Sequence, residues 1–348
     1  MPTAAKPLAR VALIAVAGLA LASCSGGGES TAPTGQASGG SAVSCEDFSV
    51  AVVDDDLRRS ALYAIENEEV DTTAFPGLEI SYLALPALFQ ATATGQYDLI
   101  EGSLIGVPQA RGQGIDLKIV ALSSGNKAPD DATGVVGIYV MDDSPIRSAA
   151  DLAGKTVGVT SFGSTGTFYE QVILDENYGL NSALQGGDVR WTELDPAQLV
   201  IGLERGTVDA IVGYSYVSWL MGQDEDKYRQ LTNTTAEWRE LTGGNNVSAA
   251  FQALGTQIEE RPECYTAFQA MLTESIDYAR ENVSDIAATV AETTGFPAEY
   301  VEFQWGDTYD YVGNLDEEWL DAGQALWDEA KRAGKFEETL DIRDEVVQ

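Results

Sequence analysis

The chain has 348 residues, 44% of them hydrophobic, which is too long for one ordinary core and predicts at least two packed units. Its 55 acidic residues against 20 basic ones give a net charge of −35, so nucleic acids and anionic lipid surfaces are poor partners. Histidine is absent, which excludes histidine-based catalytic triads, histidine-ligated zinc and imidazole acid–base chemistry. The acidic excess leaves two interpretations open: adaptation to high salt, or simply a well-solvated secreted surface.

The first 24 residues have the pattern of an export signal. Lys6 and Arg10 precede an apolar run over residues 11–22, and Leu21-Ala22-Ser23-Cys24 closes it with small residues and a cysteine. The run is too short to cross a bilayer, which requires about 20 apolar residues. The segment resembles a bacterial lipoprotein signal peptide over residues 1–23, with Cys24 as the lipidated first residue of the mature chain.

Residues 24–44 are mostly Ser, Gly, Thr, Ala and Pro, a composition typical of a flexible tether. We therefore expect an extracytoplasmic protein held at the cell membrane through its lipid alone. With Cys24 lipidated, Cys45 and Cys264 remain as a pair in an oxidising compartment. A disulfide between them is favoured, and two unpaired buried thiols are the alternative.

Strand and helix patterns alternate in the first part of the body. Strands are expected at residues 48–53, 78–83, 97–100 and 117–122, with helices between them at residues 57–65, 85–93 and 104–110. This order predicts a mostly parallel sheet flanked by helices.

A second unit begins near Gly134 and repeats the pattern. Residues 148–151 fit a capping box, strands are expected at residues 156–160, 189–192 and 208–212, and helices start at Thr165 and Pro196.

After Asn246 the sequence predicts an almost wholly helical segment with two apolar stripes. The chain passes between the two units near residues 124–134 and 243–248, which are polar and glycine-containing, as hinges allow. We therefore expect lobe 1 from residues 45–130 plus 247–348, lobe 2 from residues 131–246, and a cleft between them.

Four segments carry a resemblance to a known family: residues 97–103 (YDLIEGS), 143–159 (DSPIRSAADLAGKTVGV), 163–165 (GST) and 206–210 (GTVDA). With the signal and tether, they resemble a solute-binding lipoprotein of an ABC importer, in the nitrate, sulfonate and taurine class that includes binders of a thiamine-precursor pyrimidine. The resemblance implies a two-lobed α/β periplasmic-binding fold of type II, a ligand held between the lobes, and delivery to the transmembrane subunits of a permease. We also expect a monomer that is not an enzyme and that uses no cofactor or metal.

The first candidate ligand-binding segment joins a strand to a helix and contains Ser161, Gly163, Ser164 and Thr165. Backbone N–H groups and the dipole at a helix start favour an anionic or oxygen-rich group. Strand ends of open α/β sheets are also where ligands usually bind. The alternative is an ordinary Gly-Ser turn with a helix cap.

The second candidate set is acidic and belongs to lobe 1: Asp54 and Asp55 follow its first strand, and Glu101 with Ser103 follows its third. Carboxylates in a cleft repel a simple anion strongly once water is excluded. We therefore expect a ligand with a cationic nitrogen facing Asp54 or Asp55 and an oxygen-rich end facing Ser164 and Thr165. The alternative is that these acids cap a helix or belong to the general acidic surface.

The third candidate set is aromatic: Tyr214, Tyr216 and Trp219 follow a strand of lobe 2, where their rings would cover a planar ligand such as a pyrimidine. Core packing is the equal alternative. Two further functional classes stay open at this point, a secreted hydrolase working with carboxylates alone and an adhesive or structural lipoprotein.

Overall fold

The computed structural model describes residues 43–92 and 94–347. The expected signal peptide, the expected lipidation site Cys24 and nearly all of the expected tether lie outside these residues. Within them, no helix combines the length and the apolar character that a membrane crossing requires.

Lobe 1 is built on a five-stranded sheet with the strand order β2-β1-β3-β12-β4. Its strands are β1 Ser49–Val53, β2 Glu79–Leu83, β3 Leu99–Ser103, β4 Leu117–Leu122 and β12 Ala249–Leu254. Strands β2 and β3 pair in parallel with β1, whereas β12 lies antiparallel between β3 and β4. The four strands predicted in this lobe are thus confirmed as one sheet, and four of the five run in one direction.

Lobe 2 contains a separate five-stranded sheet with the order β10-β6-β9-β7-β8. Its strands are β6 Gly137–Met141, β7 Thr156–Val159, β8 Arg190–Glu193, β9 Ala210–Gly213 and β10 Tyr228–Gln230. Only β6 runs against the other four. In each lobe the reversed strand is therefore the first one after the chain crosses over, so both sheets are mixed.

The crossing segments form a third, small sheet. Strand β5 (Ser124–Asn126) pairs antiparallel with β11 (Asn246–Val247) on one side and with β13 (Tyr309–Tyr311) on the other. The two expected crossings thus lie side by side and are joined by backbone hydrogen bonds. The two larger sheets are not continuous with each other.

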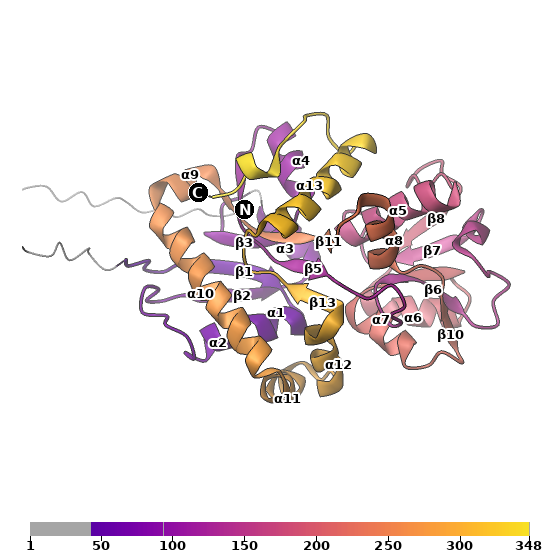
Figure 1. The fold of residues 1–348 in the computed structure, drawn as a ribbon, viewed down its shortest axis with the longest axis horizontal. Coiled ribbons are helices and arrows are strands. Elements are labelled where there is room, and N and C mark those ends of the chain that lie inside the picture. Colours follow the sequence, from indigo (N-terminus) through magenta and orange to yellow (C-terminus); the bar gives the residue numbers. More distant parts are fainter. Residues whose placement is uncertain (1–42, 93, 348) are drawn as a thin grey trace, which may run out of the picture. The chain divides into compact units, whose positions relative to one another are not determined.

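Helices flank both sheets (Figure 1). Those of lobe 1 are α1 Asp56–Ala61, α2 Tyr63–Glu66, α3 Leu85–Thr92, α4 Gly106–Gly112, α9 Gly255–Glu260, α10 Pro262–Glu281, α11 Val283–Thr294, α12 Ala298–Phe303 and α13 Glu317–Arg332. Those of lobe 2 are α5 Thr165–Tyr178, α6 Pro196–Glu204, α7 Ser215–Gly222 and α8 Thr234–Thr242. Short helical turns lie at Ala149–Leu152, Gln304–Thr308 and Ile342–Asp344. The two-lobed α/β fold is confirmed.

The apolar stripes predicted on the C-terminal helices form the core of lobe 1. On α10, Tyr265, Phe268 and Leu272 are buried and pack with Phe48 and the strands of the sheet. On α13, Trp319 and Trp327 are buried in a second cluster with residues of α4 and β4. The prediction of an almost wholly helical segment after Asn246 is wrong at β12, which lies between β3 and β4 in the sheet, and at β13, which pairs with β5.

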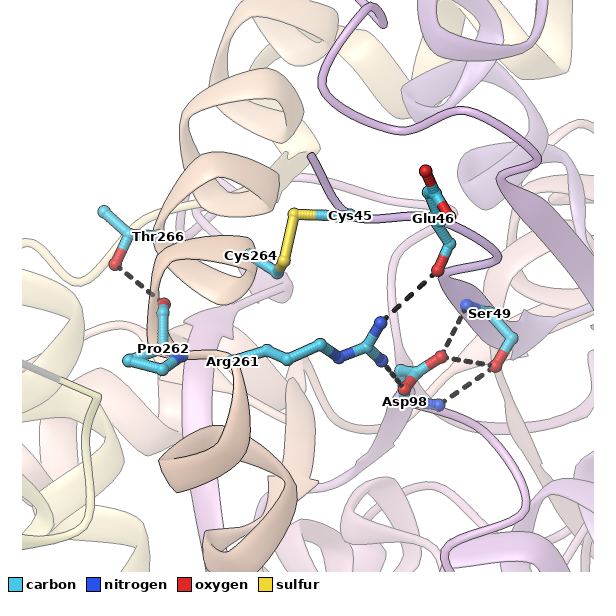
Figure 2. Close-up of a disulfide and its surroundings, with 8 residues drawn as sticks. All are labelled: Cys45, Glu46, Ser49, Asp98, Arg261, Pro262, Cys264 and Thr266. Atoms are coloured by element: carbon cyan, nitrogen blue, oxygen red, sulfur yellow. Dashed lines mark hydrogen bonds and ion pairs between the residues drawn. A yellow bond between two sulfur atoms is a disulfide. The ribbon is translucent and has the colours of Figure 1, made fainter. Parts of the chain in front are cut away.

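A disulfide joins Cys45, just before β1, to Cys264 in the first turn of α10, with the two Cα atoms 5.7 Å apart. Figure 2 shows the polar contacts beside it: Arg261 forms an ion pair with Asp98. The carboxylate of Asp98 also accepts hydrogen bonds from the backbone N–H and the hydroxyl of Ser49, at 2.8 and 2.9 Å. The start of the body is thus fastened to a distant helix within one lobe.

Candidate functional site

A cavity of about 220 Å³ lies between the lobes at the carboxyl ends of their strands. Lobe 1 lines it with residues at the carboxyl ends of β1 and β3 and with Arg58 of α1, and lobe 2 lines it with residues that follow β7 and β9. The crossing strands add further residues at one side. The lining residues are Val53, Arg58, Leu88, Glu101, Gly102, Ser103, Ser124, Asn126, Val136, Thr160, Ser164, Thr165, Gly166, Tyr169, Tyr214, Ser215, Asn246, Ser248, Ala249 and Tyr309.

A buried ion pair forms the lobe 1 wall. The Nε of Arg58 on α1 donates to the carboxylate of Glu101 on β3 at 2.8 Å, and its Nη2 donates to the other carboxylate oxygen at 2.9 Å. A further Nη2 bond of 3.1 Å reaches the hydroxyl of Ser124 on crossing strand β5. Although burial opposes its charge, the carboxylates of Asp55 and Glu101 raise the pKa of Arg58 above its ordinary value. Arg58 is therefore a fixed cation whose charge is already balanced by protein carboxylates.

The amino end of helix α5 forms the opposite wall. Ser164 is its N-cap, with an extended backbone and a hydroxyl that accepts from the N–H of Thr167 at 3.1 Å. The N–H groups of Thr165 and Gly166 have no protein acceptor within the described residues. Free N–H groups and the helix dipole make this wall suited to a negative or oxygen-rich group.

The ring of Tyr214 packs directly on the first turn of α5 and leaves no room for a side chain at position 166, where the chain has a glycine. A Cβ at position 166 would lie 2.3 Å from a ring carbon of Tyr214. The Tyr214 hydroxyl also lies 3.1 Å from that of Thr167, and burial raises the pKa of Tyr214 above its ordinary value. The ring is thus held in place as part of the cavity wall.

Direct hydrogen bonds join the two lobes beside the cavity. The hydroxyls of Ser103 (lobe 1) and Thr165 (lobe 2) lie 2.7 Å apart. Thr165 also donates to the carbonyl of Ser248 at 2.9 Å, and Tyr169 on α5 donates to the carbonyl of Val247 at 2.7 Å. The structure is therefore a closed arrangement in which lobe 2 contacts the lobe 1 sheet and the crossing strand.

The candidate acids of lobe 1 separate into two groups. Glu101 and Ser103 line the cavity. Asp54 and Asp55 do not line it: Asp54 pairs with Arg59 at 2.8 Å, and Asp55 caps α1 by accepting from the N–H of Arg58 at 2.9 Å. The helix-capping alternative therefore describes Asp55, and Glu101 is the carboxylate at the cavity.

The candidates of lobe 2 also separate. Ser164, Thr165 and Tyr214 line the cavity, whereas Ser161 and Gly163 lie in the turn behind it. The carbonyl of Ser161 accepts from the hydroxyl of Thr167 at 2.8 Å and so shapes that turn. Tyr216 and Trp219 point elsewhere and pack against two aromatic rings of lobe 1.

Several lining residues were not among the sequence candidates, chiefly Arg58, Asn246, Ser248 and Tyr309. Arg58 carried a signal, because it stands three residues after Asp55 at a helix start, where a cap and an ion pair are common. Asn246 lies on β11, Ser248 between β11 and β12, and Tyr309 on β13, and nothing local marks these three residues. Burial raises the pKa of Tyr309 to about 12, so its hydroxyl stays protonated at neutral pH.

The charged groups of the wall are few. Of the described lining residues only Arg58 and Glu101 carry charge, and Asp55 adds a second carboxylate on the far side of Arg58. Within the described residues no cluster of three or more acidic or cysteine ligands could hold a metal ion. The cavity therefore combines apolar side chains such as Val53 and Val136 with polar groups, with a slightly negative lobe 1 end and a donor-rich lobe 2 end.

Comparison with known proteins agrees with this geometry. A family model described as an ABC transporter, phosphonate, periplasmic substrate-binding protein matches residues 79–236, which include β3, β7, α5 and β9. The resemblance to ABC-transporter substrate-binding proteins is confirmed. The matched segment supplies the lobe 2 wall and Glu101 and Ser103 of the lobe 1 wall.

Solved binding proteins share the fold along nearly their whole length. The periplasmic aliphatic sulphonate binding protein SsuA of Escherichia coli is 20% identical, covers 88% of this chain and 98% of its own, and superposes with a TM-score of 0.66. The alkanesulfonate-binding protein SsuA of Xanthomonas axonopodis pv. citri, bound to MOPS, is 19% identical over 88% of this chain and 99% of its own, with a TM-score of 0.65. The binding-protein fold is thus shown, at an identity too low to transfer a ligand.

An enzyme also shows similarity, over a shorter stretch. The 4,5-dihydroxyphthalate decarboxylase of Pseudomonas putida is 31% identical over 105 residues, which is 30% of this chain and 37% of the enzyme. The chain thus matches about a third of the length of this curated relative. The match shows that related sequence occurs in an enzyme as well as in transport proteins.

Proposed function

We propose that this protein is the extracytoplasmic solute-binding protein of an ABC importer, which captures a small organic nutrient between its lobes and presents it to the permease. The observation that carries the proposal is the cavity closed from both sides by polar groups at strand ends. Binding there would stabilise the contacts between the lobes, and release would require only that they separate. No bond of the solute needs to change.

The charges of the two walls favour a zwitterion over a simple anion. At the lobe 1 end, Asp55 and Glu101 together exceed the charge of Arg58 by one negative unit. At the lobe 2 end, α5 offers N–H groups and the hydroxyls of Ser164 and Thr165. A cationic nitrogen near Glu101 and an oxygen-rich group at α5, such as a sulfonate, would satisfy both ends.

The cavity volume argues for a small solute. About 220 Å³ lies below the 300–1,000 Å³ typical of pockets for drug-sized ligands. An amine-bearing sulfonate of taurine size suits this volume. Nitrate and simple alkanesulfonates lack the cationic group that Glu101 would bind.

A planar heterocycle such as a thiamine-precursor pyrimidine is the second candidate, and Tyr214 favours it because its ring lines the cavity. Two of the three aromatic residues considered for that role contact lobe 1 rings instead. Hydrolysis by carboxylates needs two of them at the reacting bond, and Glu101 is the single carboxylate among the described lining residues. A solute-binding function therefore agrees better with the lining of the cavity than a hydrolase function does.

Calorimetry with taurine, MOPS, ethanesulfonate and nitrate, on protein stripped of bound solute, tests this ligand class. We expect taurine to bind and the amine-free ethanesulfonate to bind at least tenfold more weakly. Glu101→Gln should abolish this preference, whereas Asp54→Asn, at an exposed carboxylate outside the cavity lining, should preserve it. Equal affinity for both sulfonates in the parent protein would contradict the zwitterion proposal.

Mass spectrometry of the small molecule that co-purifies with the protein tests receptor against enzyme. A receptor returns the captured molecule unchanged after prolonged incubation, whereas an enzyme returns a product. Loss of carbon dioxide from a bound acid would favour the decarboxylase relationship over transport.

Membrane attachment through Cys24 belongs to the same proposal, in which the protein works as a tethered monomer. Cys24→Ser should move the protein from the membrane fraction to the soluble extracytoplasmic fraction, because the lipid is its only anchor. Labelling with a radioactive fatty acid should be lost in parallel. Incorporation of label into the variant would contradict lipidation at this cysteine.

A further inference from the structure

Four aromatic side chains meet between the lobes outside the cavity lining. Tyr216 and Trp219 lie on α7 of lobe 2, and Phe296 and Tyr300 lie at the junction of α11 and α12 in lobe 1. The ring of Tyr216 is centred 4.6 Å from that of Phe296 and 5.1 Å from that of Tyr300, and Trp219 is 5.6 Å from Tyr300. We call these four residues the aromatic cluster.

The aromatic cluster joins the two lobes in this closed arrangement. Two of its residues belong to lobe 1 and two to lobe 2, and each lobe has its own sheet. The chain connects the two lobes only through the crossing segments among the described residues. Tyr300 is buried, with 1% of its surface exposed, while Tyr216, Trp219 and Phe296 are partly buried. Separation of the lobes would place these rings in water, which disfavours the open form.

Helix α7 connects the cluster to both the cavity and a crossing segment. Ser215, its first residue, lines the cavity and has a φ of +45°, a left-handed conformation that a serine rarely adopts. At the other end of the helix, a Cβ on Gly222 would lie 2.5 Å from the Cα of Gly134 in the crossing segment. Tyr216 therefore follows directly on a cavity residue, in a helix packed against the chain crossing.

We propose that the aromatic cluster is a latch that holds the lobes together and sets the affinity for the solute without touching it. The proposal rests on the function proposed above, because a latch between lobes matters only if they open and close. Part of the closure free energy then comes from protein contacts, so the ligand-free protein already populates the closed form. A ligand that contacts Ser215 or Tyr214 binds beside the latch and completes the closure.

A cysteine pair reports the closed form in the absence of any ligand. The hydroxyls of Ser103 and Thr165 lie 2.7 Å apart across the lobes, so cysteines at both positions come within reach of a disulfide only when the lobes are closed. In full-length protein carrying Cys24→Ser, Ser103→Cys and Thr165→Cys, the initial rate of oxidation is measured, and peptide mapping distinguishes the new bond from the native Cys45–Cys264 bridge.

Tyr216→Ala and Phe296→Ala should each slow this cross-linking about tenfold, although they lie on different lobes. The double variant should be slowed by much less than the two single effects combined, because the contact between Tyr216 and Phe296 is lost in both single variants. Trp191→Ala removes a partly buried aromatic ring within lobe 2 and should lower the melting temperature without slowing cross-linking. Tyr216→Leu, which keeps an apolar side chain there, replaces Tyr216→Ala if the latter does not fold.

Cross-linking of the latch variants at the parental rate overturns the proposal, as does an equal slowing by Trp191→Ala. Additive effects of the two latch substitutions would also overturn it. The cross-linking measurement needs no ligand. If no solute is found to bind, the proposed function is contradicted, but the cross-linking rates still show whether the aromatic cluster holds the lobes together.

Discussion

At the scale of single residues, the most consequential contact is the one between Arg58 and Glu101. The sequence made Glu101 a candidate ligand-binding acid, and the structure pairs its carboxylate with the guanidinium of Arg58 at 2.8 Å. Glu101 has 1% of its surface exposed, so its charge depends on that partner. The pair thus supports both the shape and the charge of the cavity wall.

Arg58→Met should lower the free energy of unfolding by about 3–5 kcal/mol, because it leaves the buried carboxylate of Glu101 without its cation. Urea unfolding followed by circular dichroism measures this loss. Arg343→Met is the matched control, since Arg343 pairs at the surface with the exposed carboxylates of Glu317 and Asp321 and its loss should change stability little. Similar midpoints for the two variants would contradict a structural role for the buried pair.

A second buried carboxylate, Glu170 on α5, has no cationic partner among the residues that the structure describes. It is fully buried and accepts hydrogen bonds from the hydroxyls of Thr232 and Thr234. Burial raises its pKa to about 8, although these hydroxyls oppose the shift. The group is therefore protonated in the folded protein at neutral pH.

The pH dependence of stability follows from Glu170 with a definite sign. In the unfolded chain the carboxyl loses its proton near pH 4.5, whereas the folded protein keeps it until about pH 8. The unfolded state thus binds fewer protons in between, and this group makes stability fall as pH rises from 4.5 to 8, by on the order of 4 kcal/mol. Glu170→Gln should match the parent near pH 4.5 and exceed it at pH 8 in urea unfolding; an unchanged pH profile would contradict the assignment.

At the scale of elements, the sequence predicted the starts of helices well, because the residues that cap a helix lie next to it in the chain. The capping box at Ser148 and Asp151 is present, and α5 begins after its N-cap Ser164 and ends at the left-handed Gly179. Strands β12 and β6 were missed, because their residues acquire a strand conformation only by pairing with distant neighbours.

Gly166→Ala tests how closely the first turn of α5 packs against the ring of Tyr214, the residue after β9. The added methyl would clash with the ring of Tyr214, so we expect a loss of about 1–3 kcal/mol in unfolding free energy and a weakened binding of any cavity ligand. Gly163→Ala is the control in the same loop, because the nearest atom to its new methyl would lie 3.8 Å away. Equal stability of the two variants would show that the Tyr214 ring adapts.

At the scale of the whole molecule, the described chain is two sheets joined by paired crossing strands, with polar groups gathered where strands end. This arrangement explains how hydroxyls 62 positions apart in the sequence, those of Ser103 and Thr165, come within hydrogen-bonding distance. It also explains why Asn246 and Ser248, which follow most of lobe 2 in the chain, line the same cavity as Arg58.

The disulfide acts at this scale, since Cys45 and Cys264 are separated by 219 positions. Replacing both by alanine should lower the free energy of unfolding by about 2–5 kcal/mol, because the unfolded chain regains the freedom that so long a loop had lost. Thermal unfolding of the variant and of the reduced parent should agree. A variant as stable as the oxidised parent would contradict a stabilising role.

The sequence by itself determined the α/β class, most of the strands before Asn246, the helix caps and the group of polar residues at strand ends, because periodicity and capping are properties of neighbouring residues. Tertiary structure alone decided that Glu101 is paired with Arg58 and that Tyr216 and Trp219 face lobe 1 rings. Those outcomes depend on which side chains meet across the lobes and sheets. The residues next to each of these side chains in the sequence do not indicate such contacts, because the contacts form only when the chain folds.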